Sequence, residues 1–111
     1  LLSFIAADPG SYGRIMRNKQ GNVMSIVENW DATATQREVR EVNSGVYAIE
    51  PKALRLLKEI KMNKAKGEYY LTDMLEIAVF DGERVNSLPI DPKEVLGINT
   101  WEDHGQVENL I

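Results

Sequence analysis

The chain has 111 residues, 43% of them hydrophobic and 27% charged, as expected for one globular domain. Its 13 basic and 17 acidic residues give a net charge of −4, which disfavours a nucleic-acid partner. The absence of cysteine excludes disulfides, thiolate metal sites and a cysteine nucleophile. No apolar run approaches the roughly 18 residues of a membrane span and no signal-peptide pattern opens the chain, so we expect a cytoplasmic protein without a membrane partner.

The first half of the chain predicts a strand, a hairpin and a short helix. Residues 1–7 form an apolar run that ends at Asp8-Pro9-Gly10, as a buried strand before a turn does. Residues 15–17 and 23–27 are β-prone and flank a polar turn, which predicts a hairpin. A capping box at Thr35-Gln36-Arg37-Glu38 then predicts a short helix that ends near residue 40.

The second half predicts two strands and three helices. Residues 42–49 favour a strand that places Asn43 and Tyr47 on one face and Ser44 on the other. Pro51 suits the first turn of a helix that extends to residue 60. The remaining elements are an amphipathic helix over 71–79 ended by Asp81-Gly82, a strand over 84–90, and a helix over 100–111 that Gly105 weakens. Strands alternating with helices predict an α/β layered sheet with a hairpin insertion.

Three polar positions at strand ends are candidate ligand contacts. Gly13, in Tyr12-Gly13-Arg14, would let the backbone approach a sugar, although a glycine also relieves strain at a strand entry. Glu28 ends the 23–27 run, where a carboxylate can accept from sugar hydroxyls or simply face solvent. Asn43 can donate and accept at once, or it can bond its own backbone.

Two further motifs follow downstream. Glu68-Tyr69-Tyr70-Leu71-Thr72-Asp73 contains a helix cap at Thr72 or Asp73, but a cap does not account for Glu68 and the tyrosines. Asn99 precedes a second helix start at Thr100, and either Asn99 or Thr100 could serve as the cap there. The single histidine, His104, falls on a predicted helix surface with no Ser/His/Asp set around it, so we expect no catalytic role for it.

These motifs, in this order, resemble the sugar-binding half of the sugar-1-phosphate nucleotidyltransferases, most closely of the uridyltransferase domains that act on N-acetylglucosamine-1-phosphate. The resemblance runs from Asp8 to about Asn99. The sequence departs from the family before Tyr12, at Trp30, where the family has a basic residue, and at Ser44, where it has threonine. The implied fold is a partial Rossmann-like sheet of the glycosyltransferase-A kind.

The resemblance implies the reaction UTP plus N-acetylglucosamine-1-phosphate giving UDP-N-acetylglucosamine, a peptidoglycan precursor, and pyrophosphate. Its ligands would be the sugar-1-phosphate and the UDP-sugar, with Mg²⁺ as cofactor. The family's glycine-rich nucleotide loop is not found in residues 1–111, and the first residue is not methionine. We therefore expect the chain to be the C-terminal, sugar-binding half of a nucleotidyltransferase domain, without catalytic residues and inactive alone. The implied substrate-binding residues are Gly13, Glu28, Asn43, Glu68, Tyr70, Thr72 and Asn99, of which Asn99 would also bind the metal.

Two alternatives stay open on the sequence. The first is a nucleotidyltransferase that acts on another hexose-1-phosphate or with another base. The second is a non-catalytic domain that binds a sugar nucleotide or a protein partner. A truncated sheet also predicts self-association through an exposed edge.

Overall fold

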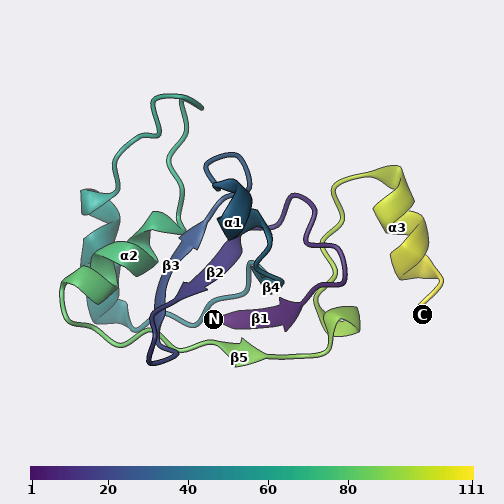
Figure 1. Cartoon of the computed structure of the whole chain (residues 1–111), viewed down its shortest axis with the longest axis horizontal. Helices are drawn as coiled ribbons and strands as arrows, with labels where there is room; N and C mark the ends of the chain where they lie inside the picture. The colour runs from purple at the N-terminus through teal and green to yellow at the C-terminus, as the bar shows by residue number, and fades with distance from the viewer.

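The computed structural model describes all residues, Leu1–Ile111, and contains one five-stranded sheet. The strand order is β3-β2-β4-β1-β5, with α2 and η1 packed together beside β3 and α3 standing away from the sheet at the other end of the molecule (Figure 1). All strand pairs are antiparallel except β1 with β5. The elements are β1 (Leu2–Ile5), β2 (Arg14–Arg17), β3 (Val23–Val27), α1 (Ala34–Arg37), β4 (Glu41–Asn43), η1 (Pro51–Glu59), α2 (Asp73–Phe80), β5 (Leu88–Pro89), η2 (Pro92–Glu94) and α3 (Trp101–Glu108).

The mixed α/β sheet and the hairpin are as the sequence predicts. β2 and β3 pair antiparallel around the polar turn, with an irregularity between Met16 and Arg17. The apolar side chains of this hairpin meet α2, because Ile15, Val23 and Ile26 form a buried cluster with Leu75 of that helix. The hairpin and α2 therefore hold each other in place through one small core.

The predicted amphipathic helix is α2. It begins at Asp73, two residues later than predicted, and its buried residues Met74, Leu75 and Ala78 lie within the predicted range. Met74 and Ala78 pack on Leu56, which is the single buried residue of η1 and is fully enclosed. The predicted helix after Pro51 exists, but it is a 3₁₀-helix rather than an α-helix.

The predicted capping box of the first helix was wrong by two residues. Thr33 is the N-cap, because its hydroxyl accepts from the Gln36 N–H while the Gln36 side chain accepts from the Thr33 N–H. Thr35 lies inside α1. A capping box needs Glu or Gln three residues after the N-cap. Thr33 is followed by Gln36 and Thr35 by Glu38, so the local motif alone did not distinguish the two threonines.

Two predicted strands are much shorter than expected. The strand predicted over 42–49 is paired only over Glu41–Asn43, because Gly45 adopts a φ of 83° and turns the chain. The strand predicted over 84–90 is reduced to Leu88–Pro89, because its partner β1 begins at Leu2, which lies opposite Leu88. The sheet edges are β3 and β5, and self-association through either stays a prediction.

The last helix begins where the sequence predicts. Thr100 is the N-cap, and Asp103 completes a capping box with it. No residue of α3 is buried, and Trp101 is 86% exposed. His104 lies 3.7 Å from Glu108 on the same helix, and its ring meets the Trp101 ring edge to face. No helix in the molecule has the length and apolarity needed to cross a membrane.

Candidate functional site

Three of the predicted substrate contacts lie side by side at the ends of adjacent strands. Arg14 of β2 pairs with Val27 of β3 and with Val42 of β4. Gly13, which precedes Arg14, is therefore level with Glu28, which follows Val27, and with Asn43, which follows Val42. In antiparallel pairing this brings Gly13, Glu28 and Asn43 into one row across the sheet. The sequence places these residues 15 positions apart, and only the strand register brings them together.

Gly13 is buried in this row, and a side chain does not fit there. A Cβ atom would lie 2.8 Å from Ile26 Cγ2 and 3.3 and 3.4 Å from the two Glu28 carboxylate oxygens. The Gly13 carbonyl accepts from the Asn43 N–H at 2.9 Å, whereas the Gly13 N–H donates to no group of the protein. The missing side chain thus leaves room for the Glu28 carboxylate.

Glu28 is joined to the predicted Thr72 by a direct hydrogen bond. The Thr72 hydroxyl donates to Glu28 Oε1 at 3.0 Å, across 44 residues of sequence. Thr72 is buried and is the N-cap of α2, although its side chain makes no capping bond. The carboxylate therefore lies at the positive end of the α2 dipole, where its charge is favoured. One oxygen of Glu28 is oriented by this contact, and Oε2 makes no hydrogen bond within the protein.

Asn43 is oriented at both ends of its amide. Its Oδ1 accepts from the Gly45 N–H at 3.0 Å, and its Nδ2 donates to the Tyr47 hydroxyl at 2.6 Å. Burial raises the pKa of Tyr47, the hydrogen bond from Asn43 opposes this shift, and the negative charge of Glu28 adds to it. The negative charge of Glu28 therefore affects the Tyr47 hydroxyl, which is the hydrogen-bond partner of Asn43. Sequence reasoning assigned no role to Tyr47, and its only signal was the shared strand face with Asn43.

Tyr70 lies among carboxylates at the border of this group. Its pKa is raised, first by burial and then by the charges of Asp31, Glu68, Glu28 and Asp73. A phenol with a raised pKa is neutral at physiological pH and can both donate and accept. The predicted Glu68 and Tyr70 thus share one acidic neighbourhood with Glu28, without a hydrogen bond among the three.

The loop that carries Glu68 is fastened to the loop after β3. Asn63 and Glu68 form an isolated bridge at the base of a turn, and Asn63 Nδ2 donates to Asp31 Oδ2 at 3.1 Å. Lys66 Nζ lies 3.5 Å from the centroid of the Trp30 ring. Trp30 itself is 72% exposed, and the cation–π contact places a positive charge beside its ring.

Buried Arg14 braces the loop before Gly13, a role that sequence reasoning missed. Its guanidinium donates to the carbonyls of Gly10 (3.0 Å), Tyr12 and Arg37 (3.4 Å). No carboxylate pairs with it, so carbonyl oxygens satisfy a side chain that is only 3% exposed. Arg14 therefore holds the loop that ends at Gly13, and with it the position of Gly13 in the row.

Asn99 is not part of the row. Its N–H donates to Asp103 Oδ2 at 3.0 Å in the cap of α3, and Gly97 of the same loop donates its N–H to the Tyr12 hydroxyl at 2.9 Å. The bond from Gly97 fastens the loop to Tyr12, the residue before Gly13, and no hydrogen bond joins Asn99 to Glu28. No cluster of three or more histidine or carboxylate groups in the chain suits a metal ion, and the Asp103 carboxylate already accepts from the Thr100 N–H in the cap, so Asn99 could supply one oxygen ligand of a Mg²⁺ site but not the whole site.

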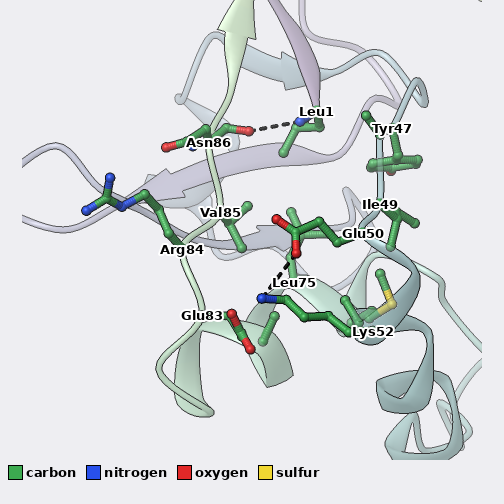
Figure 2. A pocket seen from close by; sticks show the side chains of 14 residues that line it. Leu1, Tyr47, Ile49, Glu50, Lys52, Leu75, Glu83, Arg84, Val85 and Asn86 are labelled. Atoms are coloured by element: carbon green, nitrogen blue, oxygen red, sulfur yellow. Dashed lines mark hydrogen bonds and ion pairs between the residues drawn. The ribbon is translucent and has the colours of Figure 1, made fainter.

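An apolar cavity of about 290 Å³ lies between η1, α2 and the segment before β5 (Figure 2). Tyr47 and Ile49 line one wall, Val85 and Asn86 line the opposite one, and the Glu50–Lys52 ion pair (3.1 Å) lies below. None of the seven predicted site residues lines this cavity. Tyr47 connects the two regions, since it lines the cavity and its hydroxyl meets Asn43.

Comparison with known proteins shows the family. The family model described as nucleotidyl transferase matches residues 3–111. The bifunctional protein GlmU of Caldanaerobacter subterraneus subsp. tengcongensis is 44% identical over 112 residues, covering 100% of this chain and 24% of that protein. The GlmU proteins of Nitrosococcus oceani and Methylococcus capsulatus are 46% and 43% identical, over 99% of this chain and 25% and 24% of their own lengths. The chain thus spans about a quarter of the curated relatives it matches, and it belongs to the nucleotidyl transferase family.

Proposed function

We propose that the chain is the sugar-phosphate-binding part of a sugar-1-phosphate nucleotidyltransferase, of the kind that makes UDP-N-acetylglucosamine from UTP and N-acetylglucosamine-1-phosphate. The observation that carries the proposal is the row of Gly13, Glu28 and Asn43, closed on one side by Thr72. The matched GlmU relatives support the choice of reaction.

The row offers the chemistry that a hexose needs. A sugar presents hydroxyls that must donate and accept within a small area, so a binding site needs acceptors, donors and little bulk. Glu28 supplies a charged acceptor, Gly13 a free N–H, and Asn43 one group of each kind. Hydrogen bonds to a carboxylate are shorter and stronger than neutral ones, which makes Glu28 the dominant contact of the three.

In the proposed reaction the protein acts by positioning. The phosphate of the sugar attacks the α-phosphorus of the nucleotide in line and pyrophosphate leaves, so no covalent intermediate with the protein is required. The residues of this chain would hold the hexose so that its phosphate has one orientation. Asn99 is proposed as a single Mg²⁺ ligand, and the other ligands would have to come from outside residues 1–111. The metal, when bound, would neutralise phosphate charge.

A titration of the chain with N-acetylglucosamine-1-phosphate and UDP-N-acetylglucosamine, by calorimetry, tests the proposal. We expect saturable binding that Glu28→Gln weakens by about 10- to 100-fold, the range for losing a hydrogen bond to a charged group. Glu59→Gln is the matched control, because Glu59 is exposed on η1 and makes no ion pair. The proposal fails if a folded sample binds neither ligand, or if both substitutions have the same effect.

A further inference from the structure

The amide of Asn43 has a defined polarity. The Gly45 N–H can only donate, so the Asn43 atom that faces it at 3.0 Å must be the oxygen. The nitrogen then faces the Tyr47 hydroxyl at 2.6 Å and must donate to it. A flipped amide would place Nδ2 against the Gly45 N–H, two donors with no acceptor between them, which is strongly unfavourable.

This arrangement leaves two groups of the amide for a ligand. An amide nitrogen has two hydrogens and an amide oxygen has two lone pairs. One hydrogen is used by Tyr47 and one lone pair by Gly45. Asn43 therefore presents one N–H and one lone pair at fixed positions, rather than an amide free to rotate.

Tyr47 is itself held in place. Its ring packs against the core cluster that includes Ile26 and Leu75, and it lines the wall of the cavity opposite Val85 (Figure 2). Burial, with the nearby Glu28 charge, raises the pKa of the Tyr47 hydroxyl, which therefore keeps its hydrogen at neutral pH. The hydroxyl thus accepts from Asn43 and still has its own hydrogen to donate.

We propose that Tyr47 is a positioning residue of the sugar site, which orients the Asn43 amide so that one donor and one acceptor face the substrate. The inference rests on the proposed function, because it assigns the groups that this site offers to a hexose. The ligand class is a sugar edge on which one hydroxyl, or two neighbouring ones, accepts from Asn43 Nδ2 and donates to Oδ1. Such an edge uses both free groups at once, and a substrate with only acceptors there would leave the Asn43 oxygen unpaired.

Tyr47→Phe tests the inference, because it removes the hydroxyl and keeps the ring in the core. The Asn43 side-chain amide is followed by heteronuclear NMR in the labelled chain, and affinity for N-acetylglucosamine-1-phosphate is measured by titration. We expect the two Nδ2 proton signals to shift and their hydrogen exchange to accelerate, and the affinity to fall about 3- to 10-fold, the value of one net hydrogen bond. Thr35→Val is the control for loss of a hydroxyl, since Thr35 is exposed on α1 and its hydroxyl has no partner in the protein; it should change neither readout.

An unchanged Asn43 amide signal in Tyr47→Phe overturns the inference, and so does unchanged affinity in a wild type that binds. A general loss of structure is recognised by shifts throughout the spectrum. In that case hydrogen exchange in the wild-type chain decides, because Asn43 Nδ2 protons that exchange as fast as those of exposed Asn109 overturn the inference. If the wild-type chain binds no sugar phosphate, the proposed function fails. The NMR comparison still decides, independently, whether Tyr47 orients Asn43.

Discussion

Replacing Gly13 by alanine tests the geometry of the row most directly. The added Cβ would lie 2.8 Å from Ile26 Cγ2, well inside the roughly 3.5–4.0 Å that two carbon atoms prefer. Ile26 is only 6% exposed and is enclosed by its core neighbours, so it cannot move aside freely. Overpacking of this kind costs about 1–3 kcal/mol. The melting temperature should fall by roughly 4–8 °C for each kcal/mol in a domain of this size.

The same alanine would also lie 3.3 Å from a Glu28 oxygen, so the carboxylate must shift and binding of the sugar phosphate should weaken. Urea denaturation measures the free energy of unfolding, and calorimetry measures the affinity. Gly105→Ala is the matched control, because a Cβ there meets nothing within 4 Å and alanine favours the helix by about 1 kcal/mol. A Gly13→Ala protein as stable as the wild type, with unchanged affinity, would refute the reasoning.

Two further substitutions test the electrostatics and the corrected helix start. The hydrogen bond from Arg17 lowers the pKa of Glu41 below its ordinary 4.5, so this carboxylate stabilises the fold above that pH and loses its contribution as the pH falls through the folded value. Glu41→Gln should therefore destabilise at pH 7 and much less at pH 3, whereas exposed Glu38→Gln should show no such dependence in thermal unfolding. Thr33→Ala should cost about 1 kcal/mol in urea denaturation and Thr35→Ala close to nothing; equal costs would contradict the assignment of the N-cap.

The sequence predicted those parts of the fold that are specified by residues close to one another in the chain. The α2 stripe, the β2–β3 hairpin and the Thr100 cap arise from residues within a few positions of one another, and all three were predicted. The strand over 42–49 was not, because strand length depends on where a partner strand pairs and where the chain turns. Alternation of side chains marks which residues can form a strand, but it does not supply the partner.

The prediction of the candidate site was limited in the same way, because the residue types are local information and their contacts are not. The sequence by itself determined which residue types are available, because a glycine, a carboxylate and an amide at strand ends suit a polyol ligand whatever the fold. Only the tertiary structure decided that Gly13, Glu28 and Asn43 form one row, since their contact depends on strand register. It also joined Thr72 to Glu28 across 44 residues and connected Tyr47 to Asn43. A hydrogen bond needs two atoms within about 3 Å and correctly oriented, and the folded backbone sets that distance.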